Sequence, residues 1–340
     1  MNRSLFLAVL APLLACTPFS STSASTPIDA LDTGVTAVEA PASTTLSYTD
    51  VLGGERSIQV ELRLPDEAAA QPMPVVVWSH GGGRGKRSTT TVGARWGRAF
   101  NQAGLAFVAI AHVGREDDDR LRVCDAVGAS DCSMFSSLRW DRPHDIAAAI
   151  DWIESIAPER GLDARRVALG GHSGGALGVL NTMGLVWEYD SELHPAVDDR
   201  PIAVLAASPP GASTRHIDHD ALAALRVPMI WLTGAGDSTR STLADDRRAS
   251  FDMLTPEHSA VLFWAEREEI RHGGYNLDVA SCRRAGGVRQ PCREAVRTIA
   301  DLGVSFIERS LSTNRPFDVD RFVATAQPAV PAWGDLERAG

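Results

Sequence analysis

A serine between glycines carries the strongest chemical signal in the sequence. The motif Gly171-His172-Ser173-Gly174-Gly175 follows a short apolar run, residues 166–170, and precedes a helical pattern over residues 176–185. A serine at the apex of a sharp strand-to-helix turn needs glycines two residues before and after it, because larger side chains would clash with neighbouring backbone. The pattern therefore predicts that Ser173 is the nucleophile of a serine hydrolase.

A carboxylate and a base follow the serine in the order that this chemistry uses. Asp237 comes after an apolar run at residues 228–233, and His272 lies in the loop after the last predicted strand. We predict that His272 takes the serine proton and that Asp237 orients it. The order serine, aspartate, histidine is typical of α/β-hydrolases. The alternative base, His258, precedes the last strand and is expected at the opposite end of the sheet.

Glycines after an earlier strand predict an oxyanion hole. The apolar run at residues 75–78 leads into Ser79-His80-Gly81-Gly82-Gly83. Glycines let backbone amides approach a substrate closely, and one such donor typically contributes about 10²- to 10³-fold in rate. We predict the amides of Gly82 and Gly174 as donors, with Gly83 as an alternative.

The remaining polar clusters predict neither a metal nor an organic cofactor. Residues 216–220, His-Ile-Asp-His-Asp, lack the spacing of a zinc motif and are interpreted as a helix start. Asp245 and Asp246 are interpreted as surface charges. The acidic run at residues 116–119 lacks the pattern of a calcium loop and is interpreted as a solvated part of a long loop, residues 112–140, that forms a pocket wall. A net charge of -10 without a basic run argues against a nucleic-acid partner.

Buried strands alternate with helical patterns over residues 45–311. Unbroken apolar runs such as residues 75–78 and 105–111 indicate strands buried on both faces, and a predicted hairpin around Gly53 and Gly54 precedes them. The alternation predicts an α/β-hydrolase fold with a mostly parallel eight-stranded sheet and helices on both faces. The serine motif follows the fifth strand, where the nucleophile of that fold belongs.

The first residues have the features of an export signal. A basic start and a short apolar stretch, residues 5–14, lead into Leu13-Leu14-Ala15-Cys16, which resembles the lipobox of bacterial lipoproteins. The resemblance implies a signal at residues 1–16 and lipidation of Cys16, with ordinary cleavage near Ala24 as the alternative. We expect a cell-envelope lipoprotein held at the membrane by its lipid, or else a periplasmic or secreted protein.

The other cysteines fit an oxidising compartment. Four of the five cysteines form two closely spaced pairs, Cys124 with Cys132 and Cys282 with Cys292. Such local pairs in an exported protein predict two disulfides. Residues 17–44 are rich in Ser, Thr, Ala and Pro and are predicted to be a flexible tether. Residues 312–340 are interpreted as a C-terminal tail with no assigned function.

Three segments together resemble the bacterial esterases grouped with dienelactone hydrolases and platelet-activating-factor acetylhydrolases. These are residues 75–81, the segment Trp140-Asp141-Arg142-Pro143-His144-Asp145, and residues 171–175. The resemblance covers most of residues 45–310 and implies a serine esterase.

The chain departs from these relatives at two positions. Dienelactone hydrolases use a cysteine nucleophile where this chain has Ser173. The acetylhydrolases take their acid from just after the sixth strand, where residues 207–210, Ala-Ser-Pro-Pro, offer no carboxylate. Because no carboxylate follows the sixth strand, we assign the role of the acid to Asp237.

The sequence therefore predicts a carboxylic ester hydrolase. The short connection between the sixth and seventh strands leaves no room for a capping domain, which favours short-chain or exposed esters, including polyester surfaces. Two alternatives remain: a serine peptidase or amidase of the same fold, and a surface lipoprotein that keeps the fold but only binds ligands.

Overall fold

The computed structural model describes residues 42–50, 52–66, 72–82, 90–130, 132, 140–185, 197–214, 218, 221–222, 225, 227–281, 289–312 and 316–340. The predicted signal, the tether and Cys16 lie outside this part of the chain, as do Gly83 and Cys282. Within the described residues, no helix is both long enough and apolar enough to cross a bilayer.

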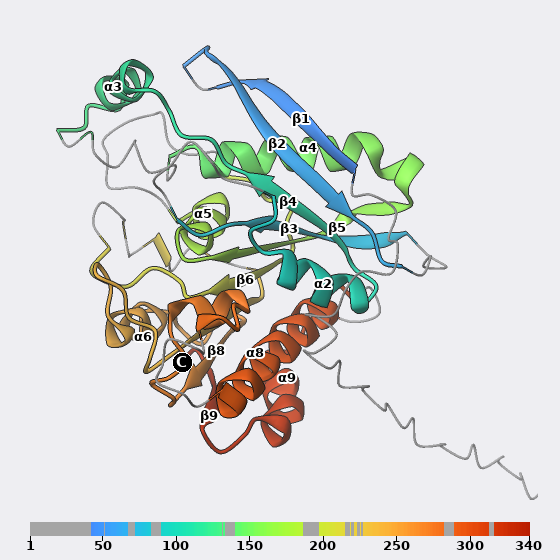
Figure 1. Cartoon of the computed structure of the whole chain (residues 1–340), viewed down its shortest axis with the longest axis vertical. Coiled ribbons are helices and arrows are strands. Elements are labelled where there is room, and N and C mark those ends of the chain that lie inside the picture. The colour runs from blue at the N-terminus through green and yellow to red at the C-terminus, as the bar shows by residue number, and fades with distance from the viewer. Residues whose placement is uncertain are drawn as a thin grey trace, which may run out of the picture.

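A nine-stranded sheet in the order β1-β2-β4-β3-β5-β6-β7-β8-β9 organises the described residues (Figure 1). The strands are β1 (Ala42–Thr49), β2 (Glu55–Arg63), β3 (Met73–Ser79), β4 (Ala106–Ala111), β5 (Leu162–His172), β6 (Ala203–Ala207), β7 (Met229–Gly234), β8 (Ala260–Ala265) and β9 (Gly334–Arg338). The six neighbouring strands β4, β3, β5, β6, β7 and β8 pair in parallel, whereas β1, β2 and β9 pair antiparallel with their neighbours. The predicted α/β-hydrolase class is confirmed, with one strand more than expected.

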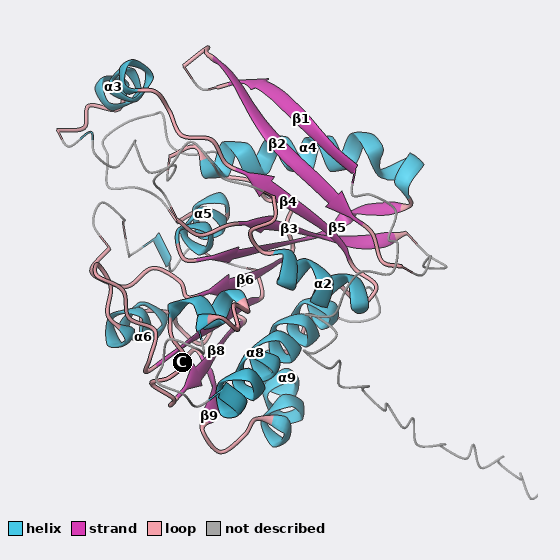
Figure 2. Cartoon of the chain, in the orientation of Figure 1, coloured by secondary structure: helices cyan, strands magenta, loops and turns pink. Residues whose placement is uncertain are grey.

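Helices cover both faces of the sheet (Figure 2). The helices of the described residues are α2 (Ala94–Gln102), α3 (Asp117–Ala126), α4 (Arg142–Arg160), α5 (Gly174–Thr182), α6 (Ala244–Asp252), α8 (Arg289–Ser310), α9 (Val319–Ala326) and the short η3 (His272–Asn276) and η4 (Gln327–Ala329). Strand side chains alternate between the faces. Val75 and Val77 therefore join the core under α4, α5 and α6, and Val76 and Trp78 join the core under α2 and α8.

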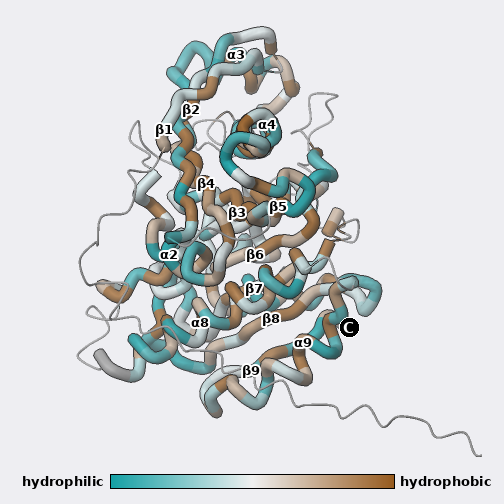
Figure 3. Tube along the Cα trace, turned by 90° about the vertical axis from the view of Figure 1, so that its right-hand side faces the viewer, coloured by the Kyte–Doolittle hydropathy of each residue, from teal (hydrophilic) through white to brown (hydrophobic). Residues whose placement is uncertain are grey.

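Two buried cores explain the unbroken apolar runs of the central strands. Every residue of β4, β6, β7 and β8 is buried, and Figure 3 shows hydrophobic colouring along the middle of the sheet. Because both faces are covered, no position on these strands needs a polar side chain. Catalytic groups must then lie in the loops at the strand ends.

The acidic segment is helical, which corrects the prediction of a loop there. Asp117, Asp118 and Asp119 form the first turn of α3. Carboxylates are favourable at a helix N-terminus because they oppose the positive end of the helix dipole. Asp119 also accepts from the guanidinium groups of Arg115 and Arg122. The charges that suggested a solvated loop thus stabilise a helix.

The C-terminal segment is part of the domain rather than a separate tail. Strand β9 pairs antiparallel with β8 and supplies the ninth strand. Phe322 of α9 is buried, and its ring centroid lies 5.2 Å from that of Phe306 in α8. Only Leu336 of β9 is buried, so this short edge strand has no strong sequence pattern.

One predicted disulfide lies wholly within the described residues. Cys124 and Cys132 are joined by a disulfide that closes the end of α3. Cys292 in α8 is also disulfide-bonded, and its predicted partner, Cys282, lies outside the described part of the chain.

Candidate active site

Ser173 occupies a strained turn between β5 and α5. Its φ is 57° and its ψ is -121°, a backbone conformation that non-glycine residues rarely adopt. A Cβ atom on Gly171 would overlap the carbonyl of Gly175, and one on Gly175 would overlap the carbonyl of Ser79. Glycine at both positions therefore lets β3, β5 and α5 meet around the partly exposed Ser173.

Asp237 and His272 are directly hydrogen-bonded at the same edge of the sheet. The distance from His272 Nδ1 to Asp237 Oδ1 is 2.8 Å. Asp237 is completely buried, and Thr233 Oγ1 donates to its Oδ2 at 2.8 Å. Burial raises the pKa of the Asp237 carboxyl, but the hydrogen bond from His272 and the charge of Arg247 outweigh it, so this pKa lies below its usual value. Asp237 is therefore held as a carboxylate that orients the imidazole.

Ser208 is a fourth member of this network, and sequence reasoning missed it. Its hydroxyl donates to Asp237 Oδ1 at 2.8 Å and lies 2.7 Å from His272 Nδ1. Both contacts are on the Nδ1 side of the ring, and Ser208 is completely buried. Ser208 therefore supports the acid and base, while the opposite ring nitrogen remains for a nucleophile. Its position directly after β6 is its one sequence signal, and residue type alone does not distinguish a serine there from an ordinary loop residue.

His172 links the serine turn to the loop that carries His272. His172 Nε2 donates to the backbone carbonyl of His272 at 2.9 Å, and the two ring centroids are 4.7 Å apart. Burial and the neighbouring His272 lower the pKa of His172 to about 3. This neutral imidazole packs against His272 and donates a local hydrogen bond. No hydrogen bond joins Ser173 to His272 among the described residues, and such bonds are often long before substrate binds.

The predicted oxyanion loop lies against the serine turn. Gly82 has a φ of 86°, and a Cβ on Gly174 would lie 3.2 Å from the Gly82 carbonyl oxygen. A Cβ on Gly81 would lie 3.2 Å from Ser173 Cβ. The structure thus brings Gly82 and Gly174 together beside Ser173. The alternative donor, Gly83, lies outside the described residues.

A polar cavity of about 280 Å³ opens beside Ser173. Its lining residues are Ser173, Gly174, Leu177, Pro210, Ser213, Thr214, Thr239, Ser241, Thr242 and Arg247. Six of these ten residues carry a hydroxyl group, and Leu177 and Pro210 are apolar. Arg247 is buried and donates to the backbone carbonyls of Asp237 and Ser208. At this volume the cavity suits a short group better than a long alkyl chain.

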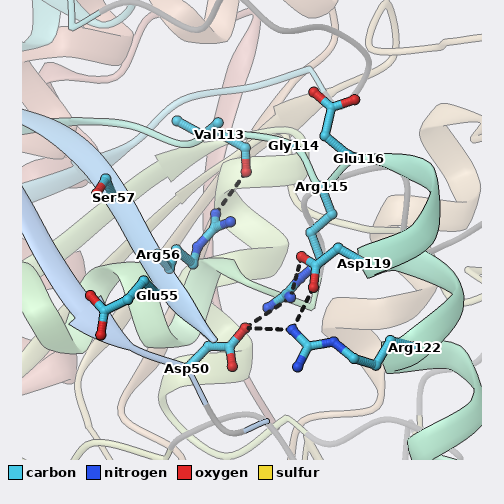
Figure 4. Close-up of a pocket in the computed structure, with 10 residues that line it drawn as sticks. All are labelled: Asp50, Glu55, Arg56, Ser57, Val113, Gly114, Arg115, Glu116, Asp119 and Arg122. Carbon is cyan, nitrogen blue, oxygen red and sulfur yellow. Dashed lines mark hydrogen bonds and ion pairs between the residues drawn. The ribbon is translucent and has the colours of Figure 1, made fainter. Parts of the chain in front are cut away.

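A second cavity, of about 240 Å³, lies between the first hairpin and α3 (Figure 4). It is lined by Asp50, Glu55, Arg56, Ser57, Val113, Gly114, Arg115, Glu116, Asp119 and Arg122. Its main charges pair with one another, for example Arg115 with Asp50 at 2.9 Å and with Asp119 at 2.7 Å. The described part of residues 112–140 thus lines this cavity, and none of its residues lines the one at Ser173.

The other candidates lie away from the acid and base. The imidazole of His258 accepts from the Thr255 amide in the turn before β8, and Asp246 in α6 accepts from Ser213. His216 and His219 fall outside the described residues. In the part of the chain that the structure describes, no three His, Cys, Asp or Glu side chains cluster as a metal site would require.

Comparison with known proteins identifies the fold. No family model and no curated protein matches the chain. An acylaminoacyl peptidase bound to Z-Gly-Gly-Phe-chloromethyl ketone matches with a TM-score of 0.52 and 15% identity, over 83% of this chain and 43% of the peptidase. The acylaminoacyl peptidase of Pyrococcus horikoshii matches with a TM-score of 0.52 and 14% identity, over 84% and 44%. The chain has the α/β-hydrolase fold.

These similarities extend to the fold alone. The chain spans less than half the length of either acylaminoacyl peptidase. A 2,6-dihydroxy-pseudo-oxynicotine hydrolase also matches, with a TM-score of 0.48 and 13% identity, over 78% of this chain and 69% of that protein. At such identities the chemistry of this chain must be argued from its own residues.

Proposed function

We propose that this protein is a serine hydrolase of carboxylic esters, with Ser173 as nucleophile, His272 as base and Asp237 as the orienting acid. One observation carries the proposal. The strained turn at Ser173 lies at the same sheet edge as a hydrogen-bonded histidine and buried aspartate, which is the arrangement that activates a serine hydroxyl.

The reaction begins when Ser173 Oγ attacks the ester carbonyl carbon and its proton passes to His272 Nε2. The carbonyl oxygen becomes an oxyanion, which the amides of Gly82 and Gly174 stabilise. The tetrahedral intermediate collapses, the bond to the alkoxy oxygen breaks, and His272 gives its proton to the leaving alcohol. Water then attacks the acyl-serine with the same base, releasing the acid and restoring Ser173.

Asp237 keeps the imidazole ready for both proton transfers. By accepting from Nδ1 it leaves Nε2 unprotonated and directed away from the acid. It also stabilises the imidazolium that forms during the attack. Ser208 and Thr233 hold the two carboxylate oxygens in place.

The cavity favours short or polar ester groups. Its volume of about 280 Å³ is close to the lower end of the roughly 300 to 1,000 Å³ of small-molecule sites. Strand β6 ends at Ala207 and β7 begins at Met229, so the 21 residues between them are too few for a capping domain. We infer a preference for acetyl to butyryl esters, or esters exposed on a larger molecule or polymer surface, over long lipids.

Export and membrane attachment remain proposals. We propose that acylation of Cys16 holds the domain at the cell envelope through the tether at residues 17–44, with a periplasmic or secreted form as the alternative. The disulfide between Cys124 and Cys132 supports a location outside the reducing cytosol.

Active-site labelling tests the catalytic proposal. A fluorophosphonate should form one adduct, on Ser173, and the Ser173→Ala variant should neither label nor hydrolyse p-nitrophenyl acetate. Acetate and butyrate esters should be cleaved faster than palmitate, and a matched p-nitroanilide should be cleaved slowly. If the folded protein forms no adduct on Ser173, the proposal that it is an enzyme is refuted, and the alternative of a protein that only binds ligands is favoured. Faster anilide cleavage would favour an amidase or peptidase.

A further inference from the structure

Arg142 is a buried cation between the oxyanion loop and the nucleophile helix. It is the first residue of α4, and its side chain is fully buried. A Cβ on Gly178 of α5 would lie 2.8 Å from Arg142 Cδ, so a glycine in that helix makes room for the arginine. A Cβ on Gly174 would lie 3.8 Å from Arg142 Nη2. The guanidinium group therefore lies close behind the serine turn.

The guanidinium group binds the loop that follows β3. Its Nη1 donates to Ser79 Oγ at 2.8 Å and to the His80 carbonyl at 2.6 Å, and its Nη2 donates to the Gly82 carbonyl at 2.8 Å. The carbonyl of Gly81, between them, accepts from His80 Nδ1 at 2.7 Å. The carbonyls of three successive residues are thus held. The amide of Gly82 belongs to the middle one of these three peptide groups, so its direction is fixed as well.

A chain of buried hydrogen bonds supports this contact from behind. Ser79 accepts from Arg142, and its Oγ lies 2.8 Å from His112 Nε2. On the other side of that ring, His112 Nδ1 lies 2.7 Å from Asp145 Oδ2. Burial and the charge of Arg142 lower the pKa of His112 to about 3, so the ring is neutral and donates to Asp145. Asp145 is paired with Arg56 at 2.8 Å, at the wall of the second cavity.

We propose that Arg142 is the positioning residue of the oxyanion hole. The inference rests on the proposed function and goes beyond it by naming what holds the Gly82 amide. Without support, a glycine loop is flexible and the Gly82 amide would not keep one direction. Arg142 fixes that direction because this buried cation binds two carbonyls and one hydroxyl of the loop. Oxyanion stabilisation depends on donors that are placed before the reaction, and a misplacement of about 1 Å can cost roughly 10²-fold in rate.

Kinetics of Arg142→Lys and Arg142→Ala test the proposal. Lysine keeps the charge but cannot span both carbonyls with a planar fork. We expect kcat for p-nitrophenyl acetate to fall about 10²-fold in both variants, with KM changed less than about threefold, because the donor acts on the transition state. The affinity for a boronic acid that forms a tetrahedral adduct on Ser173 should fall by the same factor as kcat/KM. Added guanidinium ion should restore part of kcat in Arg142→Ala.

Arg115→Met is the matched control. The side chain of Arg115 is also buried and pairs with Asp50, Asp119 and Asp141, but among the described residues it binds no carbonyl of the oxyanion loop. We expect the control to lower the melting temperature and leave kcat unchanged.

Two results would overturn the positioning role. One is wild-type kcat and boronic-acid affinity in a folded Arg142→Lys protein. The other is an equal loss of kcat in the Arg115 and Arg142 variants without guanidinium rescue, which would mean a merely structural role. Either result, with the wild type active and Ser173→Ala inactive, leaves the proposed function intact. Absence of wild-type turnover and of any Ser173 adduct would instead refute the proposed function and this inference together.

Discussion

Replacing Ser208 with alanine should weaken the active site without abolishing it. The substitution removes one donor from the Asp237 carboxylate, which is completely buried. Asp237 keeps its hydrogen bonds from His272 and Thr233. A hydrogen bond to a charged group contributes about 1.5 to 3 kcal/mol to stability, so we expect the free energy of unfolding at pH 7 to fall by that amount.

The catalytic loss should be much smaller than the loss of a nucleophile. His272 remains oriented by Asp237, so we expect kcat/KM for p-nitrophenyl acetate to fall by about 10-fold, which corresponds to about 1.4 kcal/mol. Removal of the nucleophile in a serine hydrolase costs on the order of 10⁶-fold. Ser173→Ala and Ser208→Ala should therefore differ by orders of magnitude.

The loss of stability should depend on pH with a definite sign. The pKa of Asp237 is lower in the folded protein than its usual value, so its contacts stabilise the fold above the unfolded pKa of about 3.9 and lose their effect as the pH falls through the folded pKa. The difference between wild type and Ser208→Ala in urea unfolding should accordingly be full at pH 7 and shrink as the pH falls below about 4.

Ser208→Gly separates the hydroxyl from the backbone. Ser208 has a φ of 52°, a conformation that is strained for alanine and serine but not for glycine. Glycine and alanine should lower kcat/KM equally, while the glycine variant should be the more stable of the two. Full kcat/KM in Ser208→Ala would show that its hydroxyl does not support Asp237 in catalysis. An inactive Ser208→Ala beside an active Ser173→Ala would instead make Ser208 the nucleophile.

Two further predictions concern the rest of the domain. Burial lowers the pKa of His112 and of His172 to about 3, so the unfolded chain binds protons that the folded one does not. The free energy of unfolding should fall as the pH drops from about 6.5 toward 4, by about 1.4 kcal/mol per pH unit for each histidine. Urea unfolding at a series of pH values should show that the free energy of unfolding depends less steeply on pH in His112→Gln than in the wild type. Phe322→Ala should lower the free energy of unfolding by about 3 to 5 kcal/mol, because it empties a core position under α9. Its p-nitrophenyl acetate activity should be unchanged, and a stability loss below about 0.5 kcal/mol in a melting experiment would contradict the packing of the C-terminal segment.

The fold and the meeting of Asp237 with His272 could be predicted because their signals are local. Strands buried on both faces require unbroken apolar runs, and the turn at Ser173 requires glycine at 171 and 175 for steric reasons that any backbone of this kind imposes. Asp237 and His272 each follow a strand, so the strand order alone brings them to one edge. These features need no knowledge of packing between distant segments.

Ser208, β9 and Arg142 could not be predicted because their signals are not local. A serine hydroxyl supports a carboxylate only when two loops meet, and residue type does not reveal this. Strand β9 is an edge strand with one buried residue, Leu336, so its alternation is too short to recognise. The first residue of a helix is commonly exposed, but Arg142 is buried because its partners include backbone carbonyls of another loop. Backbone acceptors leave no trace in a sequence.

Backbone strain in the described residues is concentrated where the chemistry is proposed. Three non-glycine residues there have positive φ: Ser173 at 57°, Ser208 at 52° and Leu277 at 56°. Ser173 directly follows β5 and Ser208 directly follows β6. Leu277 directly follows η3, which contains His272. Such conformations cost of order 1 to 3 kcal/mol each and persist only where the surroundings fix them.

Backbone hydrogen bonds fix all three strained residues. The Ser173 amide donates to the Ala207 carbonyl at 3.0 Å and the Ser208 amide donates to the Leu232 carbonyl at 2.8 Å, so each strained serine is tied to the next strand of the sheet. The Leu277 amide donates to Gly274 within η3 at 2.9 Å. Ser173, Ser208, Asp237 and His272 follow the neighbouring strands β5, β6, β7 and β8, so the sheet sets the spacing of these side chains. The hydrogen bonds to the sheet therefore keep Ser173 and Ser208 in backbone conformations that would otherwise be unfavourable.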